Sequence, residues 1–292
     1  MIEDEVLFTP QLATVVVELH REITSVLDYY CGISYLELCL LASIQTHRGS
    51  MSLADFPVNT CSNTNTVIAA TTRLHEKGLC VKTKSPHDRR MIVLHETIEG
   101  KALLKEGVEH IYQQLKRTVW QKHSDEDIDE IMQSFKAQVK AFGIKEIEVN
   151  RYSHPVITPA YFLSVAVILN RWINEVKTFS GLSLTEFRCL LLLGNRPTPL
   201  TCSKIAETLI MDRSSITAVI TSLKNQCFVT VAKGSDRRSK EVALTEKGEV
   251  CAALITAKLS RATAELYSSI DSQLKSKTNE LHMRMYSAFA YY

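Results

Sequence analysis

The stretch GSDRRSKEVALTEKG, residues 234–248, has a close counterpart earlier in the chain in PHDRRMIVLHETIEG, residues 86–100. In both stretches Asp-Arg-Arg is followed by a Thr, and a Gly stands three residues after that Thr. Asp88 and Asp236 are 148 residues apart, which is about half of the 292-residue chain. Similarity within a chain at a fixed spacing is the signature of a repeated structural unit. The sequence therefore predicts two related halves.

Length and composition fit this prediction. A chain of 292 residues, 45% of them hydrophobic, suits two globular domains of about 150 residues each. The opening MIEDEVLFTP is acidic and lacks the basic-then-apolar order of a secretion signal. The apolar run VITPAYFLSVAVILN is shorter than the roughly 20 residues that a membrane span needs. We therefore expect a cytoplasmic protein that does not enter a membrane.

The net charge of +2 is divided unevenly between the halves. Residues 1–148 carry 16 Lys and Arg against 21 Asp and Glu, a net charge of −5, whereas residues 149–292 carry 18 against 11, a net charge of +7. The second half therefore has the stronger electrostatic attraction for a polyanion. The net charge is +3 in each of the two segments that include the Asp-Arg-Arg stretches, residues 50–95 and 200–244. The first half can therefore still bind a phosphate backbone.

Matching helices precede each Asp-Arg-Arg stretch. Helical spacing of apolar residues follows Leu12 in the first half and Phe162 in the second. Next come ISYLELCLLASIQ and LSLTEFRCLLLLGN, in which Ser34 and Ser183 stand three residues before a Glu, the spacing of a capping box. These serines are 149 residues apart, so one residue is gained or lost before Asp88, and we place this change in the loop-like VKTKSPH.

A helix-turn-helix pattern comes next in each half. In residues 200–231 the sequence predicts a short helix, a turn, and a second helix capped by Asp212, with a buried stripe at Ile216, Val219, Ile220 and Leu223. The first half offers Ser62 or Asn63 as the cap and Val67, Ala70 and Leu74 as the stripe, but Pro57 should shorten or kink its first helix. Two β-prone runs then flank each Asp-Arg-Arg loop, and long helical patterns end each half, from Thr97 to about Phe142 and from Thr245 to Tyr292.

This order of elements resembles the MarR (multiple antibiotic resistance regulator) family of winged helix-turn-helix transcription factors, present twice in tandem. The second half is the closer match, because DRSSIT is similar to the start of the family's recognition helix and DRRSKEVALTEKG to its wing. The first half keeps Asp88, Arg89, Arg90, Thr97 and Gly100, but it has Glu96 where the family pattern has Leu and SNTNTV where it has Asp-Arg-Ser.

The resemblance implies a mainly α fold with small β wings (α+β), in which two winged helix-turn-helix units are joined by a helical pseudo-dimer seam. We expect a first, more divergent repeat at residues 1–145, a linker at 146–156 and a second repeat at 157–292. Family members are usually homodimers joined through their terminal helices, so this chain is expected to act as a monomeric, intramolecular pseudo-dimer. The expected partner is double-stranded DNA with a pseudo-palindromic or asymmetric operator, read by two helices about one helical turn apart.

The candidate DNA-binding residues fall into two groups. The recognition helices offer side chains that can contact bases or phosphates: Arg213, Ser214, Ser215 and Thr217 in the second half, and Asn63, Thr64, Asn65 and Thr66 in the first. The wings offer Lys233, Asp236, Arg237, Arg238, Asp88, Arg89 and Arg90. Wing arginines can contact phosphates or enter a narrow minor groove, and we expect Asp236 to orient one of them through a charge-assisted hydrogen bond. The alternative for both groups is an ordinary solvated surface.

The two recognition helices are expected to read different half-sites. The first-half residues can hydrogen-bond to bases but bring no positive charge, so that half lacks the commonest specific contact, from Arg to guanine.

Other candidate sites are weaker. Tyr161, Phe162 and Trp172 could line a pocket for a small aromatic effector, as in related regulators, although packing in the seam explains aromatic residues at helical spacing equally well. Cys31 is the cysteine whose surroundings suggest the least burial, whereas Cys39 and Cys189 lie in apolar helical runs and are expected in the core. His75, Cys80, His87 and His95 match no zinc spacing. We expect neither a metal nor a cofactor.

Three classes of function were compared. The first is a sequence-specific DNA-binding transcriptional regulator, which the resemblance favours and which would respond to a ligand. The second is a winged-helix ligand receptor or protein-interaction module that has lost specific DNA binding, which the divergent first half favours. The third is an enzyme, but the sequence has no Gly-rich phosphate loop, nucleophile elbow or HExxH motif, so we do not expect catalysis.

Overall fold

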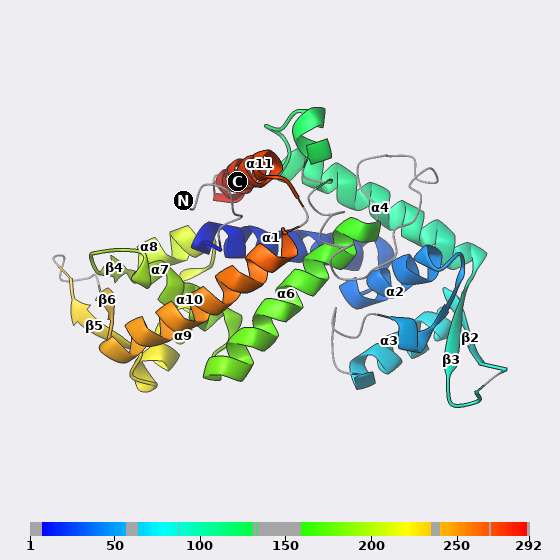
Figure 1. Cartoon of the computed structure of the whole chain (residues 1–292), viewed down its shortest axis with the longest axis horizontal. Helices are drawn as coiled ribbons and strands as arrows, with labels where there is room; N and C mark the ends of the chain where they lie inside the picture. Colours follow the sequence, from blue (N-terminus) through cyan, green and yellow to red (C-terminus); the bar gives the residue numbers. More distant parts are fainter. Residues whose placement is uncertain are drawn as a thin grey trace. The chain divides into compact units, whose positions relative to one another are not determined.

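The computed structural model describes residues 8–56, 64–86, 88–130, 133, 159–234, 240–268 and 270–290. Helices make up most of these residues, and two small antiparallel sheets accompany them (Figure 1). The expected mainly α fold with small β wings is therefore confirmed.

The elements follow one another in a similar order in the two parts of the chain. The first part contains α1 (Pro10–Val26), the π-helical turn η1 (Leu27–Cys31), α2 (Tyr35–Thr46), β1 (Ser50–Ser52), the 3-10 helix η2 (Leu53–Asp55), α3 (Thr64–Glu76), β2 (Cys80–Lys84), β3 (Ile92–Glu96) and α4 (Ile98–Thr118). The second contains α6 (Pro159–Ser180), α7 (Leu184–Gly194), β4 (Leu200–Thr201), α8 (Cys202–Leu209), α9 (Arg213–Asn225), β5 (Val229–Lys233), β6 (Lys240–Leu244), α10 (Glu246–Leu266) and α11 (Ser272–Ala290).

The chain divides into two compact units whose members are not contiguous in sequence. One unit holds the described residues of Met1–Val17, Trp172–Ser268 and Lys275–Tyr292, and the other those of Glu18–Arg171 and Ser269–Leu274. Helix α1 therefore contributes residues to both units, and so does α6. The division into repeats at 1–145 and 157–292 stays a prediction about the sequence, and the linker at 146–156 lies outside the described residues.

Each sheet has three strands, and the middle strand is the last in sequence. The first sheet has the order β1-β3-β2, with Met51 opposite Leu94, and the second has the order β4-β6-β5, with Val231 opposite Val242. In both middle strands one residue is fully buried, Leu94 in β3 and Val242 in β6, and its neighbours are half-buried or exposed. Each middle strand therefore turns one side chain fully into the core at its centre.

The predicted capping boxes are present in both halves. Ser34 Oγ accepts the backbone N–H of Glu37, whose carboxylate accepts the backbone N–H of Ser34 at 2.8 Å. Ser183 and Glu186 make the same reciprocal pair at the start of α7, also with a 2.8 Å bond. Each box satisfies backbone donors that the first helical turn leaves unpaired, so it fixes where α2 and α7 begin.

The Thr and Gly that follow each Asp-Arg-Arg stretch perform one structural task. Thr97 caps α4 and Thr245 caps α10, and each hydroxyl accepts the N–H of the Gly three residues later. A Cβ atom on Gly100 would lie 1.9 Å from the carbonyl oxygen of Leu79, and one on Gly248 would lie 2.1 Å from that of Phe228. Only glycine allows α4 to approach the turn between α3 and β2, and α10 the turn between α9 and β5, this closely.

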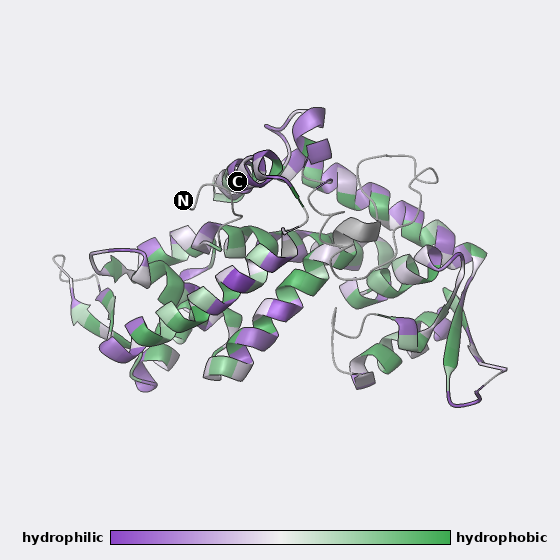
Figure 2. Cartoon of the chain, in the orientation of Figure 1, coloured by the Kyte–Doolittle hydropathy of each residue, from purple (hydrophilic) through white to green (hydrophobic). Residues whose placement is uncertain are grey.

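Hydrophobic and hydrophilic stretches alternate along the helices, and the tip of the β2–β3 hairpin is hydrophilic (Figure 2). Helices α2 and α7 are the central helices of their cores, because the run from Leu38 to Leu41 and the run from Cys189 to Leu193 are buried on all sides. Among the described residues no single helix is long and apolar enough to cross a membrane, although α1 with η1 and α2, bent by 84°, pass that test as a pair.

Candidate nucleic-acid interface

Helices α8 and α9 form a helix-turn-helix. Helix α8 ends at Leu209, and Ile210 adopts the left-handed conformation with φ of 54°, which turns the chain sharply. Helix α9 then begins at Arg213 with Asp212 as its N-cap, as predicted. Ile216, Ile220 and Leu223 are buried, and the expected Val219 of the same stripe is half-buried. The opposite face of α9 is exposed to solvent.

Asp212 organises the first turn of α9. Its carboxylate accepts hydrogen bonds from the hydroxyl of Ser214, from the Ser215 hydroxyl at 2.6 Å and from the Ser215 backbone N–H at 2.7 Å. These bonds hold the pKa of the Asp212 carboxyl well below its usual range. Both serine hydroxyls, which we expected to contact DNA, therefore donate their protons within the protein and keep only acceptor capacity for a ligand.

Helix α3 occupies the corresponding place in the first half. Val67, Ala70 and Leu74 are buried, as predicted for its stripe, whereas Thr64, Asn65 and Thr66 are exposed. Among the described residues the helix before it is the three-residue 3-10 turn η2, where the second half has the eight-residue α8. Pro57 lies outside the described residues, so the shortening expected there stays a prediction. Asn63, like the rest of residues 57–63, lies outside the described residues.

The capping glutamates also hold α3 and α9 in place. Arg73 of α3 forms a 2.6 Å ion pair with Glu37, whose side chain is 2% exposed. At the corresponding positions Ser222 of α9 donates a 2.6 Å hydrogen bond to Glu186. Burial alone would raise the pKa of Glu37, but the Ser34 N–H and the Arg73 guanidinium outweigh it and lower the pKa.

For Glu186 burial would likewise raise the pKa, and the hydroxyl of Ser222 together with the backbone and hydroxyl of Ser183 outweighs it and lowers the pKa. One carboxylate in each half therefore caps one helix, α2 or α7, and holds a second one, α3 or α9, in place.

The first wing presents its arginines to solvent. Asp88, Arg89 and Arg90 lie between β2 and β3, and all three are exposed. The Asp88 carboxylate accepts the backbone N–H of Arg90 at 2.9 Å, which shapes the turn. Among the described residues neither arginine forms an ion pair, so both guanidinium groups are available to an anion.

In the second wing Lys233 is exposed at the end of β5. Asp236, Arg237 and Arg238 lie outside the described residues, and so does the expected bond from Asp236 to an arginine.

Arg188 is a site residue that the sequence analysis missed. Its side chain is buried, with 2% exposed, and Nη2 donates to the carbonyl oxygen of Leu209, the last residue of α8, at 2.8 Å. The same nitrogen donates to Thr14 Oγ1 at 2.9 Å. A guanidinium thus holds the end of α8, where the turn to α9 begins. An Arg within an otherwise apolar helical run was the signal that could have indicated this role.

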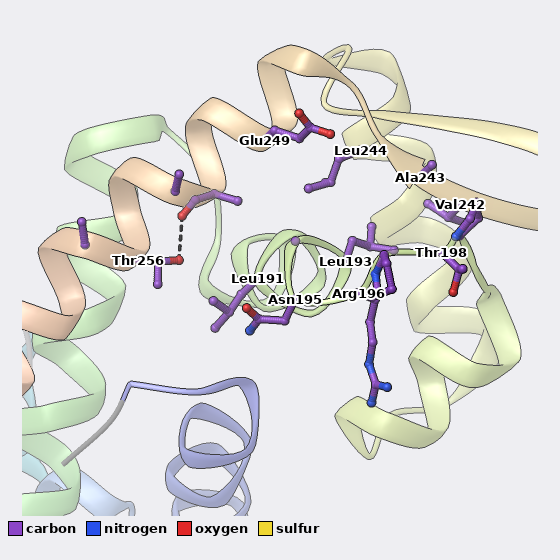
Figure 3. A pocket seen from close by; sticks show the side chains of 16 residues that line it. Leu191, Leu193, Asn195, Arg196, Thr198, Val242, Ala243, Leu244, Glu249 and Thr256 are labelled. Atoms are coloured by element: carbon purple, nitrogen blue, oxygen red, sulfur yellow. Dashed lines mark hydrogen bonds between the residues drawn. The ribbon is translucent and has the colours of Figure 1, made fainter. Parts of the chain in front are cut away.

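The proposed effector residues are only partly described. Trp172 is buried with 1% exposed and meets the ring of Phe8 edge-on, with ring centroids 5.0 Å apart. Tyr161 and Phe162 belong to α6, but their side chains lie outside the described set. A separate pocket of about 580 Å³ lies between the α7–β4 loop, β6 and α10, and Figure 3 shows Arg196 and Glu249 on opposite sides of it.

The thiols singled out from the sequence offer little reactivity, and Cys227, not Cys31, is the exposed cysteine among the described residues. Burial, followed by the charge of Glu106, raises the pKa of Cys31, which opposes the thiolate that a redox sensor needs. Cys39 and Cys189 are buried, as expected, and burial raises the pKa of Cys189 to about 12. Within the described ranges no group of three or more His, Cys, Asp or Glu is placed to hold a metal ion.

Comparison with known proteins identifies the second winged unit. The MarR family profile matches residues 182–240, which run from just before α7 to the start of β6. This segment is similar to the MarR family. No curated protein sequence matches the chain.

Solved structures similar to the chain include a transcriptional regulator of the MarR family from Rhodococcus sp. RHA1, at 22% identity and a TM-score of 0.32 over 34% of this chain and 71% of that one. Another is CouR from Rhodococcus jostii RHA1 bound to p-coumaroyl-CoA, at 20% identity and a TM-score of 0.32 over 35% of this chain and 72% of that one.

Proposed function

We propose that the chain is a sequence-specific, double-stranded DNA-binding transcriptional regulator that acts as an intramolecular pseudo-dimer. The observation that carries the proposal is the helix-turn-helix of α8 and α9 within the segment that the MarR profile matches, because the exposed face of α9 begins with Arg213 and is free of acidic residues after its N-cap, Asp212. A helix of this length fits the major groove of DNA and can present side chains to base edges.

The two-copy arrangement is supported by the spacing of matched features. Strands β2 and β5 begin 149 residues apart, and so do α3 and α9 and the two capping boxes. After the loop of each wing the offset is 148, both between the starts of β3 and β6 and between the starts of α4 and α10. Residues of α1 that group with the second winged unit, such as Thr14 bonded to Arg188, are what an exchange of terminal helices between two covalently linked protomers would produce.

The two halves would read their half-sites differently. Arg213, at the start of α9, can make a bidentate contact with guanine, whereas the aligned residue of α3 is Thr64, which is neutral. Asn65 can instead pair with adenine. The operator would then be asymmetric or an imperfect palindrome.

The experiment is a fluorescence-anisotropy titration of the full chain with the DNA beside its own gene and with scrambled DNA, across a salt series. Tight, sequence-dependent binding that weakens steeply with salt supports the proposal. In the variant with Arg237→Ala and Arg238→Ala, the salt slope should fall by about 2 if both side chains contact phosphate. The variant with Arg89→Ala and Arg90→Ala should lose less affinity for DNA. Equal losses of affinity would contradict the expected difference between the two wings. Arg261→Ala combined with Arg284→Ala, at exposed positions on α10 and α11, removes two charges as well and is the charge-matched control.

Ligand response is proposed at Trp172, and the side chains of Tyr161 and Phe162, the other aromatic candidates on α6, lie outside the described set. Trp172 Nε1 is buried without a hydrogen-bond partner among the described residues, so it has an unused donor for a phenolic or carboxylate oxygen. A Trp120→Phe variant would leave Trp172 as the sole tryptophan, because the chain has two. Its emission should then change as a phenolic acid is added, and an unchanged spectrum would rule out this site.

The second candidate is a winged-helix receptor or interaction module without specific DNA binding. The lack of any positive charge in the first turn of α3 favours it. Weak binding that ignores sequence in the same titration would select this function.

A further inference from the structure

We propose that α3 and α9 recognise thymine through its C5-methyl group, with a matched set of three methyl-bearing side chains on each helix. The inference rests on the proposed DNA binding and names what the helices read. In α9 the set is Thr217, Ala218 and Thr221, and in α3 it is Ile68, Ala69 and Thr72. We call each set a methyl triad.

The α9 triad is exposed, but its hydroxyl donors are already used. Thr217 Oγ1 donates to the carbonyl oxygen of Arg213 and Thr221 Oγ1 to that of Thr217, both at 2.8 Å. A threonine hydroxyl turned back to the helix backbone directs the methyl group of the same side chain outward. Since Ala218 is also exposed, this part of the helix face presents three methyl groups.

The α3 triad stands at the same positions, 149 residues earlier. Ile68 is 37% exposed, and Ala69 beside it is also exposed. Thr72 is half-buried, and its hydroxyl donates to the carbonyl oxygen of Ile68 at 3.0 Å while it accepts a bond from Lys82. Although the first turns of α3 and α9 differ in charge, this part of the two helices is chemically alike.

Thymine fits these faces better than the other bases do. In the major groove thymine presents a methyl group and one acceptor, whereas guanine and cytosine present polar edges that call for a donor or an acceptor from the protein. The triads offer apolar contact and little free hydrogen-bonding capacity. Basic side chains nearby, including Lys82 beside α3 and Lys224 at the end of α9, suit a polyanionic partner more than an apolar protein surface.

The experiment begins with selection of duplexes from a randomised pool by the full-length chain. The best duplex is then synthesised with deoxyuridine replacing thymidine, one position at a time and throughout. Uracil keeps the base pair and the O4 acceptor and lacks only the methyl group. We expect enrichment of thymine at the centre of each half-site, and a loss of affinity of roughly fourfold for each contacted methyl removed. The salt slope should stay unchanged, because phosphate contacts are unaffected.

Variants of the protein test the same contact from the other side. Thr217→Ser and Thr221→Ser keep the hydroxyl and its backbone bond while removing the methyl group, and Ile68→Ala shortens the first triad. Each should weaken binding to the thymine duplex by a similar factor and leave binding to the fully substituted uracil duplex unchanged. Thr256→Ser is the matched control, because Thr256 makes the same backbone bond, to Ala252, on α10.

The outcomes separate the two proposals. If a sequence is selected and bound tightly but uracil substitution has no effect, the methyl inference is wrong and the proposed function stands. If no sequence is enriched, both are wrong.

Discussion

Arg188 Nη2 donates a 2.9 Å hydrogen bond to Oγ1 of Thr14, a residue 174 positions earlier in the chain. The bond is buried, and the same nitrogen donates to the carbonyl oxygen of Leu209 at the end of α8. The guanidinium therefore links three segments of one compact unit: the start of α1, the central helix α7 and the helix-turn-helix. A charge held away from water depends on all its partners, because each one lost leaves a desolvated donor.

We predict that Thr14→Val lowers the free energy of unfolding by about 1–3 kcal/mol, because valine has the shape of threonine but cannot accept the bond from Arg188. Urea unfolding followed by circular dichroism measures the change. Thr24→Val in the same helix is the control, since among the described residues Thr24 bonds only within its own helix, to the carbonyl oxygen of His20 at 2.7 Å. If the two variants lose equal stability, the bond to Arg188 contributes nothing measurable.

Gly100→Ala and Gly248→Ala should each destabilise the protein by about 3 kcal/mol or more, because the new Cβ would overlap a backbone carbonyl oxygen that cannot move aside easily. Gly194→Ala is a matched control at the end of α7. There the nearest atoms to a new Cβ are a Leu244 methyl at 3.6 Å and Ala252 Cβ at 3.8 Å, which are ordinary contacts. Thermal unfolding of the three variants tests this ordering, and similar melting temperatures would contradict it.

Much of the fold could be predicted because local signals specify it. The spacing of Ser34 and Glu37 predicted a capping box, Asp212 predicted a helix start, and the apolar periodicity of α3 and α9 predicted their buried faces. Each of these depends on residues within one or two turns of one another. The segment that matches the family profile, residues 182–240, likewise lies in the half of the chain in which these signals are strongest.

What the sequence did not reveal depends on long-range contacts. The repeated Gly100 was noticed as a motif, but its reason is the carbonyl of Leu79, which no local pattern shows. In the sequence Arg188 is a single charge in an apolar run, and only the structure shows its bond to Thr14, 174 residues away. The serines at the start of α9 were expected to face DNA, and a pattern of residue types could not show that Asp212 takes both hydroxyl protons.

The two capping glutamates should contribute differently to the free energy of unfolding. Glu37 is 2% exposed and pairs with a guanidinium, whereas the partners of Glu186 are neutral hydroxyl and amide groups. Glu37→Gln should therefore cost about 1–3 kcal/mol of unfolding free energy, and Glu186→Gln less.

The cost at Glu37 should depend on pH. Because its pKa is lowered in the folded protein, the stabilisation is present above the usual value of 4.5 and is lost as the pH falls through the folded pKa. Denaturant titrations at pH 7 and in acid measure the difference from the unsubstituted protein. A cost that stays constant down to pH 3 would show that the charge of Glu37 is not its source.

His282 should make the unit that contains it sensitive to mild acid. Its ring lies in α11 with 6% exposed, Nδ1 has no hydrogen-bond partner within the described ranges, and burial lowers the pKa to about 4 from 6.5. Between these two values the unfolded chain binds a proton that the folded chain does not, so stability falls as the pH decreases from 6.5 to 4. The loss attributable to this group is about 3 kcal/mol.

His282→Leu isolates this effect, because leucine fits an apolar site and does not titrate. The variant should be no less stable than the unsubstituted protein at pH 5 and should show a flatter dependence of unfolding free energy on pH between 6.5 and 4. The comparison has to be made as a difference between the two proteins, because burial also lowers the pKa of His20, which remains in both. If the two curves run parallel through this window, His282 takes up its proton as readily in the folded protein as in the unfolded one, and its burial does not govern the acid response.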